Sequence, residues 1–222
     1  VEEPPLRGQR GHAAMAQIAP AAERNKDVIF EVLNATLPPQ GDATGSLRML
    51  EVSTGTGQHA AHFASLRPDL TVQPTDRELG MAESVRAHAL EAGAADRVSP
   101  LGLLDVLQLE GSEPLAGPQY DLAVCINMLH IAPPECQEGL FAACGRAVKS
   151  GGFLMVYGPF RVDGFLCESN QKFENGFLKG QDVRNAIREL RDLERIASAH
   201  GFALEKTHEM PANNLTLVWR RA

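Results

Sequence analysis

Leu47-Arg-Met-Leu-Glu-Val-Ser-Thr-Gly-Thr-Gly-Gln-His59 is the stretch of sequence that decides the fold. It contains an apolar run, then a turn with Gly55 and Gly57, then the start of a helix. This order predicts a buried strand that enters a helix through a glycine turn, the unit with which open α/β sheets form a nucleotide-sized crevice. Glycine suits the turn because it tolerates positive φ and lets a ligand approach the backbone closely.

The acid at the end of this predicted strand, Glu51, lies four residues before Gly55. Dinucleotide folds instead place the first glycine of G-x-G-x-x-G at the strand end, so that a diphosphate reaches the helix N-terminus. Here His59 and Ala60 occupy the place where a third glycine would fall. A carboxylate before the glycines suits a cofactor that has a cationic tail and no pyrophosphate. S-adenosylmethionine fits that description and NAD does not.

Three further apolar segments also end in polar residues, at the spacing of βα units. Asp76 lies 19 residues beyond Gly57, near the place where doubly wound folds have the acid that binds ribose hydroxyls. A single acid at a strand end is commonly a helix N-cap. Four polar strand ends in order instead favour a nucleoside-bearing cofactor at the carboxyl edge of a sheet. The three segments are Leu70–Asp76, Val98–Asp105 and Tyr120–His130.

The rest of the chain predicts helices that follow strands, preceded by a helix from Pro20 to Leu37 with an apolar stripe. Alternating residues near the C-terminus predict an antiparallel edge hairpin of strands 202–209 and 215–220. The segment 158–180 is rich in glycine and aromatic residues and is predicted to be a long functional loop. The other predicted elements are helices at 58–66, 78–92, 134–148 and 192–200, a turn at 149–152 and a strand at 153–157.

The composition is typical of one globular domain. Of the 222 residues, 44% are hydrophobic and 22% are charged. We expect this domain to span residues 20–222, after a mobile leader (1–19) that is rich in proline and charge. The leader has no apolar core of a signal peptide, and the chain does not begin with methionine, so the N-terminus is expected to be trimmed.

The net charge and the cysteine content indicate which partners and metal sites the protein is expected to lack. The net charge of −7 argues against nucleic acid as the main partner, since binding phosphates requires a basic face. The sequence contains no run of 18 apolar residues, so no membrane-spanning helix is predicted. The four cysteines show no C-x-x-C spacing, which argues against structural zinc, and Cys125 and Cys144 fall in apolar stretches as core residues. We therefore expect a cytoplasmic protein, monomeric or weakly dimeric, that acts on a small molecule.

Taken together, these motifs resemble a class I, Rossmann-like S-adenosylmethionine-dependent methyltransferase from about Leu47 to the C-terminus. The resemblance is closest to the methyltransferase-like protein 26 family, a family catalogued as a domain of unknown function. It implies a doubly wound, mostly parallel seven-stranded sheet with an antiparallel last strand and helices on both faces. The segments that carry the closer match are Ala22–Asp27, Ser53–Ala60, Cys125–His130, Tyr157–Phe160, Leu190–Asp192 and Met210–Asn214.

The resemblance also implies roles for residues at the strand ends. Glu51 would lie near the cationic methionyl portion of the cofactor, Asp76 would bind the ribose hydroxyls, and Asp105 would accept from the adenine amino group. Arg24 either caps the cofactor carboxylate or is a solvated helix charge. The cofactor-binding residues expected in this way are Arg24, Asn25, Glu51, Gly55, Gly57, Asp76, Leu104, Asp105, Asn127 and Met128.

Methyl transfer from a sulfonium needs alignment and exclusion of water rather than a metal or a covalent nucleophile. A general base is required only if the acceptor carries a proton at neutral pH. His130 is the candidate base because histidine titrates in the useful range; the alternative is a histidine satisfied by a backbone carbonyl. Tyr157 is the second catalytic candidate. The residues expected to contact the substrate are His59, Phe160, Asn170, Phe173, Asn213 and Asn214, although the two adjacent asparagines also suit a plain turn.

Other functions remain open at the level of sequence. The first interpretation is a small-molecule methyltransferase whose product is S-adenosylhomocysteine. A protein or peptide methyltransferase, or a non-catalytic S-adenosylmethionine-binding protein, would have the same cofactor motifs. The sequence does not indicate whether oxygen, nitrogen or sulfur receives the methyl group.

Overall fold

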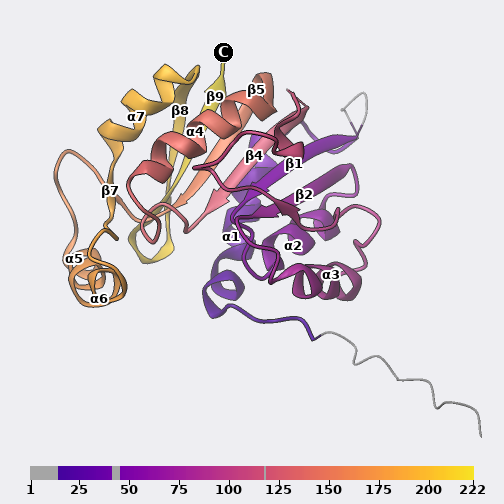
Figure 1. Cartoon of the computed structure of the whole chain (residues 1–222), viewed down its shortest axis with the longest axis horizontal. Helices are drawn as coiled ribbons and strands as arrows, with labels where there is room; N and C mark the ends of the chain where they lie inside the picture. Colours follow the sequence, from indigo (N-terminus) through magenta and orange to yellow (C-terminus); the bar gives the residue numbers. More distant parts are fainter. Residues whose placement is uncertain (1–14, 42–45, 118) are drawn as a thin grey trace, which may run out of the picture.

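The computed structural model describes residues 15–41, 46–117 and 119–222. Within them, seven strands form one sheet in the order β3-β2-β1-β4-β5-β9-β8, as Figure 1 shows. Neighbouring strands from β3 to β5 are parallel, whereas β9 runs antiparallel to both β5 and β8. The predicted doubly wound α/β class with an antiparallel last strand is confirmed. The last strand lies inside the sheet, and β8 forms the edge.

The strands of this sheet are β1 (Leu47–Val52), β2 (Leu70–Asp76), β3 (Gly102–Leu103), β4 (Tyr120–Ile126), β5 (Val148–Gly158), β8 (Phe202–Met210) and β9 (Asn214–Arg221). The longer helices are α1 (Pro20–Thr36), α2 (Gln58–Leu66), α3 (Ala82–Glu91), α4 (Glu135–Ala147) and α7 (Leu190–Ala199). Side chains of α1, α2 and α3 pack in one hydrophobic cluster and those of α4 and α7 in another, so helices cover both faces of the sheet.

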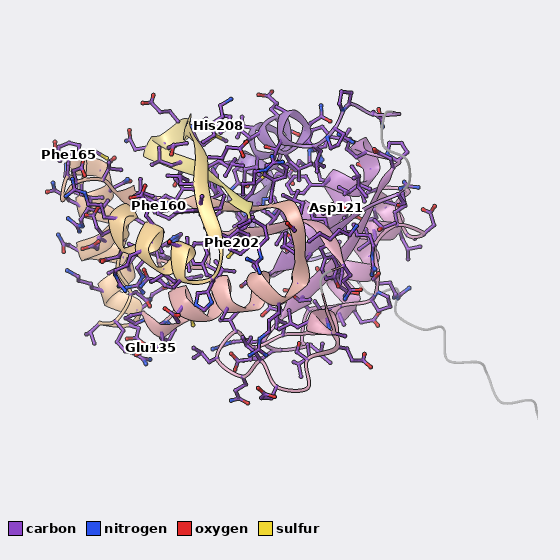
Figure 2. The ribbon with its side chains drawn as sticks, turned by 90° about the horizontal axis from the view of Figure 1, so that it is seen from above. Asp121, Glu135, Phe160, Phe165, Phe202 and His208 are labelled. Carbon is purple, nitrogen blue, oxygen red and sulfur yellow. The ribbon has the colours of Figure 1, made fainter. Side chains whose placement is uncertain are left out.

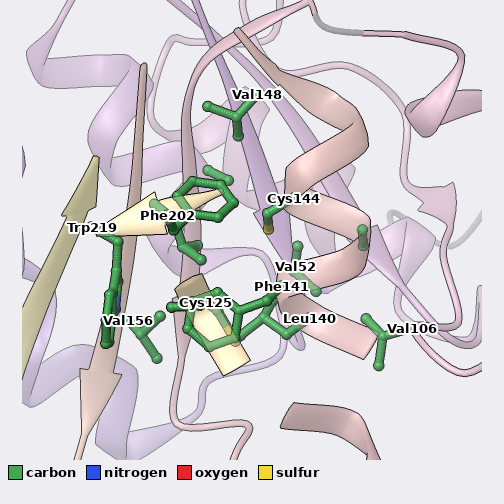
Figure 3. Close-up of a cluster of buried hydrophobic side chains, with 14 of the residues drawn as sticks. Val52, Val106, Cys125, Leu140, Phe141, Cys144, Val148, Val156, Phe202 and Trp219 are labelled. Carbon is green, nitrogen blue, oxygen red and sulfur yellow. The ribbon is translucent and has the colours of Figure 1, made fainter. Parts of the chain in front are cut away.

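Each face of the sheet has its own core. On the α4 and α7 side, Phe141 packs edge-on against Trp219, with ring centroids 5.3 Å apart (Figure 3). Cys125 and Cys144 are fully buried in the same cluster, which confirms their prediction as core residues. On the other side, Ile29 of α1 is fully buried. Each such side chain contributes roughly 1.5–3 kcal/mol on burial, so the sheet is held from both faces.

The predicted long loop at 158–180 is wrong, because this part of the chain is largely helical. We call residues 159–189 the cap segment; a small core of its own, made of Leu166, Leu178 and Ile187, holds it together. Figure 2 shows Phe165 at its outer end, 71% exposed, and Phe160 nearer the sheet. Its elements are β6 (Phe160–Arg161), α5 (Glu168–Lys172), a π-helical turn (Phe173–Leu178), α6 (Lys179–Gln181) and β7 (Arg188–Glu189).

Several boundaries also differ from the prediction. Val98 makes only an isolated bridge to Val72, and β3 is short, because Pro100 between them has no N–H to donate to a ladder. The predicted turn at 149–152 is instead the first part of β5, where the register against β4 shifts. Helix α3 begins at Ala82 rather than at 78, and α7 begins at Leu190 rather than at 192.

Residues 1–14 of the predicted leader (1–19) lie outside the described residues. Residues 15–19 lie across α2 and α3: the backbone N–H of Gln17 donates to Ser84 Oγ at 2.9 Å, and that of Ala19 donates to Gln58 Oε1 at 2.6 Å. In the part of the chain that the structure describes, no helix has the length and apolar character needed to cross a membrane.

Candidate active site

The carboxyl ends of β1, β2, β3 and β4 adjoin one another in the sheet, so the polar residues predicted there meet at one edge. Asp76, the last residue of β2, accepts a hydrogen bond from the Gly55 backbone N–H at 3.1 Å. Asp105 follows β3 by two residues, and its Oδ1 accepts from the Leu107 N–H at 2.9 Å. Asn127 follows β4 with a φ of +58° and donates its N–H to the Tyr157 carbonyl. The predicted juxtaposition of acids and glycine turn is therefore present.

The two glycines of the turn, Gly55 and Gly57, have different structural roles. Gly57 has a φ of +88°, and a Cβ there would lie 2.6 Å from the Val85 Cα of α3. Gly55 has a φ of +57°, and a Cβ there would meet nothing within 4 Å. Gly57 is therefore required for packing α2 against α3, whereas Gly55 exposes bare backbone next to Asp76.

Glu51 is a buried carboxylate at the end of β1, only 1% exposed. Thr54 Oγ1 donates to it at 2.5 Å, and within the described residues no lysine or arginine nitrogen lies within 4.0 Å of it. Burial raises the pKa of Glu51 to about 7; the Thr54 hydrogen bond opposes this rise and the negative charge of Asp76 adds to it. A buried carboxylate without a cationic partner is suited to a cationic ligand.

His59 lies between Glu51 and helix α1 and is 6% exposed. Its Nε2 is 2.8 Å from Asn25 Oδ1, and its Nδ1 is 4.0 Å from Glu51 Oε1. Burial lowers the pKa of His59 to about 4, so the ring is neutral at pH 7. Because an amide oxygen only accepts, Nε2 carries the proton. A predicted substrate contact, His59, and a predicted cofactor contact, Asn25, thus bond to each other.

Tyr157, at the end of β5, is 6% exposed, and the side chains of Asn25 and Asn214 lie near its hydroxyl. Burial raises the pKa of Tyr157, while the two amides and the charge of Arg24 lower it, and the net direction is upward. Tyr157 therefore keeps its proton at neutral pH. The predicted residues Asn25 of α1, Tyr157 of β5 and Asn214 of β9 therefore lie close together.

His130 is 7% exposed and lies edge-on to Phe173, with ring centroids 5.8 Å apart. No backbone carbonyl of the described residues accepts a hydrogen bond from its ring, so the predicted alternative of a carbonyl-satisfied histidine does not apply. Burial lowers the pKa of His130 to about 4, and the positive charge of Arg188 adds to that shift. The imidazole is neutral and a weak base.

The remaining predicted substrate residues join the cap segment to the turn between β8 and β9. Asn170 is buried and donates to the Asn213 carbonyl at 3.0 Å, and Asn213 Nδ2 donates to Ser169 Oγ at 2.9 Å. Phe173 stacks on Phe177 at 5.4 Å. Phe160, at the start of the cap segment, is instead buried in the main core.

Sequence reasoning missed three residues of this region. Thr54, inside the glycine turn, binds Glu51. Gln58 Oε1 accepts from Thr56 Oγ1, and its Nε2 donates to Glu23 of α1. Arg188 is buried and donates to the carbonyls of Leu129 and Ala132, which fixes the segment that carries His130. Thr54 and Gln58 flank the glycine motif, so their positions could have indicated a role in the site. No local sequence pattern indicates such a role for Arg188.

A cavity of about 760 Å³ lies away from this cluster. It opens beside the first residues of β1 and β4, around Arg48 and Tyr120, and near the carboxyl edge it reaches Arg77, Leu103 and Asp105. Its lining does not include Glu51, Tyr157 or His130. Among the described residues, no group of three or more His, Cys, Asp or Glu side chains is arranged to hold a metal ion.

A family model described as "Protein of unknown function (DUF938)" matches residues 16–221. The chain belongs to this family. Among curated proteins, this DUF938 chain is similar to an uncharacterized protein of Synechococcus sp., at 29% identity over 116 residues. That match covers 51% of this chain and 25% of the relative.

Several solved structures with the same fold are described as methyltransferases. An O-methyltransferase family protein from Burkholderia thailandensis has a TM-score of 0.74 at 15% identity, over 91% of this chain and 56% of that one. The mitomycin 7-O-methyltransferase MmcR has a TM-score of 0.72 at 19% identity, over 91% and 55%. Human N-acetylserotonin methyltransferase, in complex with S-adenosylmethionine, has a TM-score of 0.67 at 17% identity, over 91% and 53%. The DUF938 chain thus spans little more than half the length of these proteins, and identities this low establish the fold alone.

Proposed function

We propose that this protein transfers a methyl group from S-adenosylmethionine to a small-molecule acceptor, without a metal ion. The observation that carries the proposal is the buried Glu51 carboxylate, which pairs with no lysine or arginine among the described residues and lies beneath a glycine turn joined to Asp76. The methyltransferase names of the structural neighbours support it. On the sequence segments given above, we also propose kinship with the methyltransferase-like protein 26 family.

The residues at the sheet edge fit this cofactor. Glu51 would face the cationic methionyl group, since a buried carboxylate is stabilised by a nearby positive charge. The exposed backbone of Gly55 permits close approach. Asp76 uses its two oxygens on the N–H groups of Gly55 and Arg77 and has lone pairs left for ribose hydroxyls. Asp105 would accept from the adenine amino group, and Asn127 would hold the methionyl end.

The bound cofactor supplies a methyl group already activated on a sulfonium. The protein's own residues then have to align the acceptor and keep water out, which in favourable cases is worth effective molarities of roughly 10⁵ M. His130 and Phe173 form an apolar wall on the acceptor side. Tyr157 would present a protonated hydroxyl, because burial raises its pKa above the ordinary value.

The transfer itself is tested by incubating the protein with S-adenosylmethionine labelled in its methyl group and a cell extract. We expect the label in molecules that pass a dialysis membrane. Label retained with macromolecules would instead favour a protein methyltransferase, and no transfer to either fraction, with the cofactor bound, would favour a binding protein.

Methyl transfer by this protein should survive removal of metal ions, because the proposed chemistry needs no Lewis acid. The measurement is the rate of label transfer before and after treatment with EDTA. A loss of activity that Mg²⁺ or Zn²⁺ restores would contradict the mechanism.

Cofactor binding should depend on pH through Glu51. Its pKa of about 7 lies above the ordinary value of 4.5, so the folded protein holds a proton there that the unfolded chain releases. The stability of the free protein should therefore fall as pH rises from 4.5 to about 7 and level off above it. The ammonium group of S-adenosylhomocysteine favours the carboxylate form of Glu51, so affinity for this ligand should fall below pH 7, by up to about tenfold per pH unit.

Calorimetric titrations with S-adenosylhomocysteine between about pH 6 and pH 8 measure this dependence. Glu51→Gln cannot ionise, so its weaker affinity should be flat over the same range. A wild-type profile as flat as that of Glu51→Gln would show that Glu51 does not respond to the ligand.

A further inference from the structure

Residues 15–19, which we call the strap, are held against α2 and α3 by two buried side chains. The backbone N–H of Gln17 donates to Ser84 Oγ at 2.9 Å, and that of Ala19 donates to Gln58 Oε1 at 2.6 Å. Ser84 is 3% exposed and Gln58 is 5% exposed. Buried polar atoms are nearly always hydrogen-bonded, and here the backbone of the strap supplies one partner to each side chain.

The same two side chains also bind Thr56, which separates Gly55 from Gly57 in the glycine turn. The Thr56 hydroxyl donates to Gln58 Oε1 at 2.9 Å, and the Thr56 carbonyl accepts from Ser84 Oγ at 2.9 Å. Gln58 Oε1 therefore accepts from the strap and from the turn, while Ser84 Oγ accepts from the strap and donates to the turn. Two separate links thus join the strap to the residue between the two glycines.

The glycine turn benefits from such links because its two glycines have the greatest backbone freedom of any residue type. Both have a positive φ, +57° at Gly55 and +88° at Gly57. A site that is already ordered binds its ligand more tightly, since less ordering has to occur on binding. The bare backbone of Gly55 is the part of the turn that would meet the cofactor, and contacts that fix Thr56 also fix this backbone.

Gln58 reaches helix α1 as well as the strap and the turn. Its Nε2 donates to Glu23 Oε2 at 3.0 Å. The orientation of the Gln58 amide is fixed by the chemistry of its partners, because its oxygen faces two donors and its nitrogen faces a carboxylate. A reversed amide would set N–H groups against N–H and O–H donors. The side chain is therefore committed at both of its polar atoms.

We propose that Gln58 and Ser84 are positioning residues of the cofactor site, which hold the glycine turn in shape for S-adenosylmethionine by tying it to the strap. This inference rests on the proposed function. Neither residue is assigned a contact with the reacting atoms, and both act through Thr56. Because each side chain binds the strap and the turn together, docking of the strap strengthens cofactor binding, and cofactor binding strengthens docking of the strap by the same factor.

An exchange of donor and acceptor tests the role of Gln58. Gln58→Glu keeps the oxygen that accepts from the strap and the turn but sets a second carboxylate against Glu23, and should weaken S-adenosylhomocysteine binding by about tenfold. Adding Glu23→Gln returns a donor opposite the new carboxylate with the net charge unchanged, and should restore affinity to within about twofold. Glu23→Gln alone should also bind within about twofold, because it loses only a partly exposed ion pair with Lys26.

The second link is tested by Ser84→Ala, which should weaken S-adenosylhomocysteine binding severalfold because Thr56 and the strap each lose a hydrogen bond. The matched control is Ser65→Ala. It removes a hydroxyl of α2 that donates to the His62 carbonyl within the same helix, and should leave affinity unchanged. Isothermal titration calorimetry gives the affinity of every variant.

Hydrogen exchange on the wild-type protein tests the coupling without any substitution. Saturating S-adenosylhomocysteine should slow exchange at the amides of Gln17 and Ala19 severalfold, because the ligand makes local opening of the strap less frequent. Amides of β8, at the far edge of the sheet, serve as the reference and should respond much less.

A double variant that binds S-adenosylhomocysteine as weakly as Gln58→Glu alone would overturn the proposal. Exchange at the strap amides that saturating ligand leaves unchanged would overturn it too. Failure of the wild-type protein to bind S-adenosylhomocysteine at all would instead refute the proposed function beneath it.

Discussion

Asp76→Ala should weaken the binding of S-adenosylhomocysteine by about 100-fold. Hydrogen bonds to a charged group are worth roughly 1.5–3 kcal/mol each, and the loss of two to the ribose, about 3 kcal/mol in all, corresponds to a factor of about 100. Asp76 also accepts the Gly55 N–H, so its loss loosens the glycine turn that would meet the cofactor. Isothermal titration calorimetry with S-adenosylhomocysteine measures the effect.

Two further variants make the result specific. Asp76→Asn keeps the shape and one acceptor oxygen, and should lose less affinity than Asp76→Ala. Asp96→Ala removes an exposed acid that pairs with its neighbour Arg97, and should bind normally. Unchanged affinity in Asp76→Ala would remove this residue from the cofactor site.

Gly57→Ala should lower the free energy of unfolding by about 3 kcal/mol. A left-handed backbone costs an alanine roughly 1–2 kcal/mol, and forcing a methyl group into a packed site costs typically 1–3 kcal/mol. Both apply at Gly57, where the added Cβ would lie 2.6 Å from backbone of α3. Urea denaturation followed by circular dichroism gives the change.

Gly55→Ala is the matched control, because it has positive φ and open space around the added carbon. Its free energy of unfolding should fall only by the cost of the left-handed backbone, about 1 kcal/mol. Equal losses in the two variants would mean that contact with α3 is not the reason for glycine at position 57.

The strand ends were predictable from sequence because the signals are local. The run from Leu47 to Gly57 contains its own apolar pattern, acid and turn, and parallel strands bring Asp76 and Asp105 to the same edge by topology. The seven-stranded layout came from the family resemblance, and the strand order confirms it.

The acceptor side was less predictable because its contacts join distant parts of the chain. Asn25 of α1 bonds to His59, 34 positions away in the chain, and lies near Tyr157 of β5. The cap segment lacks a clear apolar period, and its helices depend on a small core that includes Leu166 and Ile187. No local pattern indicates that such residues will meet, so their segment was assigned as a loop.

The central claim is that the carboxyl edge of this sheet binds S-adenosylmethionine rather than a dinucleotide. Parallel calorimetric titrations of the wild-type protein with S-adenosylhomocysteine and NADH test it most directly. The account predicts saturable binding of S-adenosylhomocysteine at one site per chain and no binding of NADH. Binding of NADH, with no heat from S-adenosylhomocysteine, would contradict it.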